Sequence, residues 1–155
     1  MKRTILRMIV SVVLLVGAAG MALAQNNGIC SNASVAGTWG YTETGSVITP
    51  TGVVPYASVG QFTLDRDGNF VGQRTSSTAG TIQPATIKGT LVVNPDCTGT
   101  QTIRFYDPST GDLLSPTEVV KTVVFVDHAR EARMIIISGT SAPVVLTTEA
   151  KKLLP

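Results

Sequence analysis

The sequence predicts one all-β domain over residues 37–155, an eight-stranded antiparallel up-and-down barrel that follows an N-terminal signal segment. Three features indicate this class. Most stretches after residue 36 alternate large or apolar side chains with small or polar ones, which is the period of a β-strand. Clusters of turn residues separate these stretches at short intervals, so consecutive strands are expected to be neighbours. No stretch after the leader combines a helical period with caps, so no long helical crossover is expected.

Residues 1–24 have the layout of a secretory signal peptide. Basic residues precede an apolar run over residues 8–17, and an A-x-A triplet predicts cleavage after Ala24. The alternative is an uncleaved anchor, since residues 8–24 approach the ~20 apolar residues that a membrane span needs. The small residues ahead of the triplet favour cleavage. We therefore expect a bacterial protein that is secreted or periplasmic and that meets the membrane only through this segment before cleavage.

The mature chain has the size and charge of one weakly acidic domain. Removal of residues 1–24 leaves 131 residues, with nine Lys and Arg against ten Asp and Glu, so the net charge is about −1. A nucleic-acid partner would need a clustered basic face. The sequence shows no such cluster, so no nucleic-acid partner is predicted.

The two cysteines predict a single disulfide. Cys30 lies in a polar lead-in over residues 25–36, which we expect to be irregular, and Cys97 lies in the turn of residues 94–100. In an exported chain two cysteines are typical of one bridge. Closing so long a loop stabilises a fold by about 4 kcal/mol in the chain-entropy model. No C-x-x-C motif is present, so the bridge is expected to be structural.

The first half of the mature chain predicts four strands. The first places Trp39, Tyr41 and Glu43 on one face. Pro and Gly residues then indicate a long loop over residues 46–56. Pro84 lacks an N–H donor and is expected to delay the fourth strand. The four strands are expected over residues 37–43, 57–65, 69–76 and 86–93.

The second half predicts four more strands, and closure of all eight into a barrel leaves no unpaired edge. One of them contains residues 134–137, a run that is apolar at every position. Such a run predicts burial of both faces, by the core on one side and by an anchor segment, a neighbouring subunit of a homo-oligomer or a bound apolar molecule on the other. A short helix over residues 148–154 is the alternative to a strand at the chain end. These strands are expected over residues 98–106, 117–127, 133–138 and 144–149.

The strand over residues 98–106 has two candidate inner faces. One face carries Arg104 with threonines and a tyrosine, and the other carries Gln101, Ile103 and Phe105. If the apolar set faces the interior, Arg104 is a solvated surface charge. In the opposite register Arg104 is a buried cation that needs a carboxylate, from Glu43 or from an anionic ligand. The period alone leaves both open.

The segment Gly37-Thr38-Trp39 at the start of the first strand resembles the G-x-W motif of the calycin superfamily, the lipocalins and their relatives. The resemblance implies that Trp39 has a structural role and closes the floor of the barrel. It also implies a late basic residue that packs over this Trp, for which Lys151 is the nearest candidate.

Three further segments resemble small secreted bacterial proteins of unassigned function. They are G-T-x-G-Y at residues 37–41, D-x-x-G-N at residues 65–69 and N-P-D-C-T-G-T at residues 94–100. Such proteins look like calycin-type barrels comparable to allene oxide cyclase. This resemblance implies a fold and not an activity.

The sequence predicts no catalytic residue, metal site or cofactor, and we lean against an enzyme. The single histidine, His128, lies in a polar turn and is expected to be solvated. Nucleophile elbows, H-E-x-x-H helices and phosphate-binding Gly loops are absent. Residues 65–69 resemble a calcium loop, but their spacing is that of a hairpin turn.

A binding module is therefore the leading hypothesis. A barrel of eight strands has an interior that side chains fill or that holds one small ligand. The first alternative is a surface or interaction protein whose barrel is packed solid. The second is an isomerase that acts on a lipid by confinement, with Glu43 as its carboxylate. The residues expected to line a site for a small apolar or amphipathic ligand are Tyr41, Glu43, Phe62, Phe70, Phe105 and Phe125.

Overall fold

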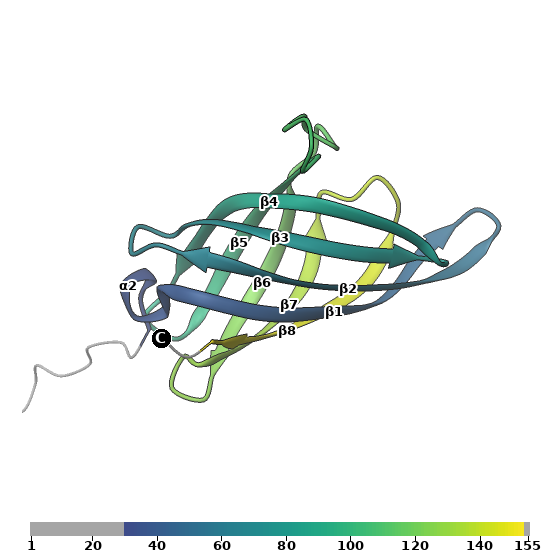
Figure 1. Ribbon diagram of the computed structural model, residues 1–155. Helices are drawn as coiled ribbons and strands as arrows, with labels where there is room; N and C mark the ends of the chain where they lie inside the picture. The colour runs from purple at the N-terminus through teal and green to yellow at the C-terminus, as the bar shows by residue number, and fades with distance from the viewer. Residues whose placement is uncertain (1–29, 154–155) are drawn as a thin grey trace, which may run out of the picture.

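The computed structural model describes residues 30–153, and within them eight strands form a closed antiparallel barrel (Figure 1). Each strand pairs with the next along the chain, and β1 pairs with β8. The predicted fold class is thus confirmed, whereas the proposed signal segment and its cleavage site lie outside the described residues. The strands are β1 (Gly37–Thr49), β2 (Gly52–Leu64), β3 (Asn69–Thr78), β4 (Thr81–Val93), β5 (Thr98–Tyr106), β6 (Val119–Val126), β7 (Glu131–Ser138) and β8 (Val144–Lys152).

The two-residue period of the strands separates an inner from an outer face. In β6 the buried residues are Val119, Lys121, Val123 and Phe125, and each residue between them is more exposed. The same alternation decides the register of β5, where Gln101 and Ile103 are buried and Arg104 is exposed. Among the described residues, no helix is long and apolar enough to cross a membrane.

Two strands are longer than the sequence predicts because prolines lie where a strand has only one neighbour. The expected loop over residues 46–56 is wrong, since β1 and β2 pair along their whole length and turn at residues 50–51. Pro55 precedes Tyr56, the first β2 residue that pairs with β3. Pro84 lies within β4, which pairs with β5 only from Thr86 onward. At such positions a missing N–H donor removes no ladder hydrogen bond on the open side.

The structure also describes the last strand and the outer face of β7, for which the sequence makes separate predictions. β8 continues as a strand through Lys152, so the terminal helix is wrong. In β7, Met134 is buried, but Ile135 and Ile137 are 46% and 59% exposed. Within residues 30–153 the outer apolar residues of β7 thus lie on the barrel surface, and their burial by an anchor segment, a second subunit or a bound apolar molecule stays a prediction.

One end of the barrel is closed by the segment before β1. The expected irregular lead-in contains a one-turn helix, α2 (Asn32–Val35), which begins with a capping box between Ser31 and Ser34. The side chain of Asn32 bonds the backbone of Asp67 and of Val93. Figure 1 shows α2 at this end, opposite the projecting β1–β2 hairpin. The helix is thereby joined to the β2–β3 turn and to the end of β4.

The interior next to α2 is packed solid around Trp39. This side chain is 1% exposed, and its Nε1 donates to the carbonyl of Val35 at 2.9 Å. Its ring centroid lies 6.4 Å from that of Phe62 and 5.9 Å from that of Phe125. Only about 10 Å³ of empty space remains here. Lys152, rather than the expected Lys151, is paired with Trp39 across β1 and β8.

The predicted disulfide between Cys30 and Cys97 is present, with a Cα–Cα distance of 5.0 Å. It joins the chain ahead of α2 to the β4–β5 turn. We expect the Cys30→Ser/Cys97→Ser variant to lose about 4 kcal/mol of unfolding free energy, because the bridge closes a long loop in the unfolded chain.

Urea unfolding of the variant and of the oxidised wild type measures this loss. Wild type in reducing buffer is the matched control, since it lacks the bridge but keeps both cysteines. Equal unfolding free energies for the oxidised wild type and the variant would contradict the prediction.

Candidate functional site: a cavity in the open half of the barrel

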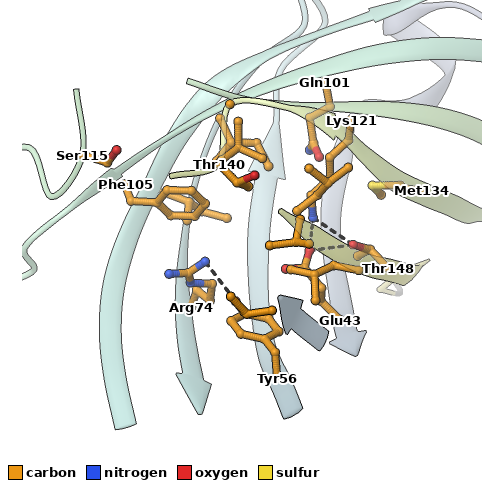
Figure 2. Close-up of a pocket in the computed structure, with 18 of the residues that line it drawn as sticks. Glu43, Tyr56, Arg74, Gln101, Phe105, Ser115, Lys121, Met134, Thr140 and Thr148 are labelled. Atoms are coloured by element: carbon orange, nitrogen blue, oxygen red, sulfur yellow. Dashed lines mark hydrogen bonds and ion pairs between the residues drawn. The ribbon is translucent and has the colours of Figure 1, made fainter. Parts of the chain in front are cut away.

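The half of the barrel away from α2 contains a cavity of about 240 Å³ (Figure 2). All eight strands contribute to its walls, and residues of the β5–β6 and β7–β8 loops, among them Ser115 and Thr140, lie at its rim. Phe62, Gln101 and Met134 border both this cavity and the packed region around Trp39. The interior is thus solid near α2 and hollow toward the opposite loops.

Strand register brings three polar side chains to one level of the cavity. On β1 the inward residues run from Trp39 through Tyr41 to Glu43, so Glu43 lies two steps above the floor. Glu43 is paired directly with Thr148 of β8. Lys121 reaches the same level from β6, two strands beyond β8. Residues that are distant in the sequence therefore meet because the barrel is closed.

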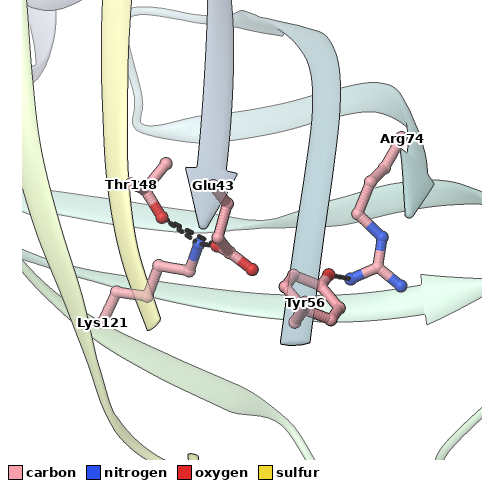
Figure 3. Close-up of polar contacts among 5 residues, drawn as sticks. All are labelled: Glu43, Tyr56, Arg74, Lys121 and Thr148. Carbon is pink, nitrogen blue, oxygen red and sulfur yellow. Dashed lines mark hydrogen bonds and ion pairs between the residues drawn. The ribbon is translucent and has the colours of Figure 1, made fainter. Parts of the chain in front are cut away.

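Glu43, Lys121 and Thr148 form a buried ion pair with a bridging hydroxyl (Figure 3). They are 4%, 4% and 2% exposed. The Lys121 Nζ donates to Glu43 Oε2 and, at 2.8 Å, to Thr148 Oγ1. The Thr148 hydroxyl in turn donates to Glu43 Oε2 at 2.7 Å. Each polar group of this triad therefore has a partner, as buried polar groups require.

The environment of Lys121 opposes its charge. Burial lowers the pKa of the Lys121 ammonium, and the positive charge of Arg74 adds to this effect, whereas Glu43 acts in the opposite direction. Without the Glu43 carboxylate, burial and Arg74 would both lower the pKa of Lys121 with nothing to oppose them. The ion pair with Glu43 is thus what favours the protonated amine in this interior.

A second polar group lies around Arg74 on the other side of the cavity, as Figure 2 shows. The Arg74 Nη1 donates to the Tyr56 hydroxyl at 3.2 Å. Its Cζ lies 4.1 Å from the centroid of the Phe105 ring, which is a cation–π distance. The Arg74 Nε is buried and has no hydrogen-bond partner among the described residues. Burial raises the pKa of Tyr56, and Arg74 partly offsets this.

The structure brings together four of the six residues that the sequence predicts for a ligand site. Tyr41, Glu43, Phe62 and Phe105 line the cavity. Phe70 and Phe125 do not, and each instead packs in the solid core. Burial raises the pKa of the Tyr41 phenol. Two phenylalanines therefore line the cavity, Phe62 at its border with the solid core and Phe105 beside Arg74.

The polar residues that sequence reasoning missed include Lys121, Arg74, Tyr56 and Thr148, and for the two cations a signal was present. Lys121 has the parity of Val119 and Val123 in β6, and Arg74 has the parity of Phe70 in β3. A charge in phase with apolar residues predicts an inward position. Thr148 gave no comparable signal, because threonine is common on either face of a strand.

Arg104, the cation considered from the sequence, lies on the outer surface. Its Nε pairs with Glu118 Oε1 at 2.6 Å, and both side chains are nearly half exposed. This outcome matches the register in which the apolar set of β5 faces inward. The cations that line the cavity are instead Arg74 and Lys121, which come from other strands.

Nothing in residues 30–153 groups three or more side chains of the types that bind metal ions. The carboxylate of Asp65 is used by its turn, where it accepts hydrogen bonds from the backbone of Asp67 and Asn69. His128 lies in the exposed β6–β7 turn. The charged and phenolic groups that line the cavity are therefore the Glu43–Lys121 pair, the Arg74 guanidinium and the phenols of Tyr41 and Tyr56, with neutral polar side chains such as Gln101 beside them.

We expect Lys121→Met to lower the unfolding free energy by about 3–5 kcal/mol, because it leaves the Glu43 carboxylate buried and uncompensated. A triple variant, Glu43→Leu/Lys121→Met/Thr148→Val, is expected to be as stable as wild type, since similar apolar volume replaces the whole triad. Urea unfolding measures both.

Arg133→Met is the control for the loss of a surface ion pair, since Arg133 pairs with Glu149 at 3.1 Å on the outside of the barrel. It should change stability by about 1 kcal/mol or less. A Lys121→Met variant no less stable than this control would contradict the prediction.

Comparisons with known proteins show similarity at the level of the fold. No protein-family model and no curated protein sequence matches the chain. A designed barrel described as "EF1p2_mFAP2b bound to DFHBI" is 17% identical, covers 80% of this chain and 100% of its own, and has a TM-score of 0.51. A redesigned β-barrel, "mFAP0, bound to DFHBI", is 21% identical over 76% of this chain and 98% of its own, with a TM-score of 0.48. The similarity is therefore one of fold, a closed antiparallel barrel of eight strands.

Proposed function

We propose that this protein is an exported binding module that holds one small apolar or amphipathic molecule inside its barrel. The observation that carries the proposal is the cavity of about 240 Å³, whose wall surface is mostly apolar. Ligand sites are typically of this kind, and pockets for drug-sized molecules measure roughly 300–1,000 Å³. The smaller volume here favours a compact ligand. The leader pattern of residues 1–24 supports secretion or a periplasmic location.

The fold is compatible with such a role. A designed barrel of similar fold, with a TM-score of 0.51, is bound to DFHBI. A closed barrel of eight strands has space for one small ligand when its interior is not filled by side chains. In this chain the solid region near Trp39 occupies one half of the interior, so the ligand would enter from the end that carries the β5–β6 and β7–β8 loops.

The two alternatives have less support. A barrel packed solid does not fit a cavity that all eight strands line. An isomerase that uses Glu43 as a free carboxylate does not fit the triad, because Glu43 Oε2 already accepts hydrogen bonds from Lys121 and Thr148. Binding requires neither a solid core nor a free base.

We expect the wild type to bind the neutral fluorescent probe N-phenyl-1-naphthylamine saturably. Ile136→Trp should weaken this binding by about tenfold or more, because Ile136 lines the cavity and the larger side chain would fill it. Ile135→Trp is the matched control, since its side chain lies on the outside of the same strand.

Fluorescence titration measures all three affinities, and circular dichroism checks that both variants keep the strand signal. The control should bind as the wild type does. Absence of saturable binding to the wild type, or equal loss in both variants, would count against a ligand site in this cavity.

A further inference from the structure

The charges inside the cavity do not balance. Its lining contains three charged side chains, Glu43, Arg74 and Lys121. Glu43 and Lys121 are paired, so together they contribute no net charge, whether the proton resides on the amine or on the carboxylate. Arg74 forms no ion pair with any residue of the described chain. The cavity therefore carries one positive charge that no protein carboxylate in residues 30–153 neutralises.

The hydrogen-bonding capacity of Arg74 is also largely unused. A guanidinium has five N–H donors. Within residues 30–153 the Arg74 guanidinium donates one hydrogen bond, to the Tyr56 hydroxyl, and its Nε is buried without a partner. A buried polar donor with no acceptor costs free energy. An acceptor that enters the cavity beside Arg74 would remove that cost.

The neighbours of Arg74 hold its guanidinium in place without neutralising it. The Phe105 ring lies against one side, and the Tyr56 hydroxyl contacts one end. Ala85 is the residue paired with Arg74 across β3 and β4, so the guanidinium reaches Phe105 of β5 past a small side chain. An arginine ordered in this way is prepared to bind a planar anion with two parallel hydrogen bonds.

We propose that the cavity selects a small amphipathic monocarboxylate, whose carboxylate pairs with Arg74 while its apolar part lies against residues such as Ile103, Ile136 and Leu146. This proposal rests on the proposed binding function and adds the chemical class of the ligand. Lys121 is not the anchor, since a ligand carboxylate there would displace Glu43 and leave it as an uncompensated buried charge.

The test compares three molecules with the same chain and different head groups. Decanoate, decanol and decylamine are each titrated against wild type loaded with N-phenyl-1-naphthylamine at neutral pH, and displacement of the probe measures their affinities. Decanoate should bind about ten- to hundredfold more tightly than decanol, as a charge-assisted hydrogen bond implies, and decylamine should bind most weakly. If the wild type binds the probe but the three molecules displace it with equal affinity, the carboxylate preference is overturned and the binding function remains intact.

Variants then locate the preference. Arg74→Gln should remove it while decanol binds as before, and Arg74→Lys should retain part of it. Arg66→Gln, in the exposed β2–β3 turn, changes the net charge equally and should keep the full preference. If the preference persists in Arg74→Gln, the assignment to Arg74 is wrong. If Arg74→Gln does not fold, Arg74→Lys and the wild-type series decide the result. A wild type that does not bind the probe would refute the binding function together with this proposal.

Discussion

The pairing of β1 with β8 is the constraint on which the rest of this structure depends. It joins the first strand to the last, and thereby gives the sheet an inside. It also sets Glu43 directly opposite Thr148. A slip of one residue would turn every inward side chain of one strand to the outside, because side chains alternate with a period of two. The cavity and its triad therefore exist only in this register.

The two halves of the interior differ in how completely side chains fill them. Near α2, the buried Trp39 and its aromatic neighbours fill the space, and the disulfide and Asn32 join the segment ahead of β1 to the β4–β5 and β2–β3 turns. Toward the opposite loops, the same inward positions carry polar and mid-sized apolar side chains that leave the cavity open. Stability is concentrated at the end that needs no access. The hollow half can then retain a charged residue that a solid core would not accommodate.

Sequence reasoning predicts the strands and the inner parity better than it predicts partners. The alternation around Trp39, Tyr41 and Glu43 is local, so the sequence predicts their shared face correctly. The partner of Glu43 is 78 residues away and is reached only through barrel closure, so no local pattern reveals it. Pro55 and Pro84 led to wrong strand boundaries, because a strand tolerates a proline where the neighbouring strand has already ended. These are tertiary facts that a single strand's residues do not encode.

The triad and Arg74 are best understood together. A buried ion pair is seldom more stabilising than apolar residues of the same volume, so stability alone does not explain its presence. Both Glu43 and Arg74 act on the pKa of Tyr41 and of Tyr56, which places the two charges in one electrostatic neighbourhood. Glu43 is the only carboxylate among the described residues that line the cavity, and it is paired with Lys121 rather than with Arg74. If the cavity takes the monocarboxylate that we propose, this pairing is what leaves the Arg74 guanidinium free for the ligand.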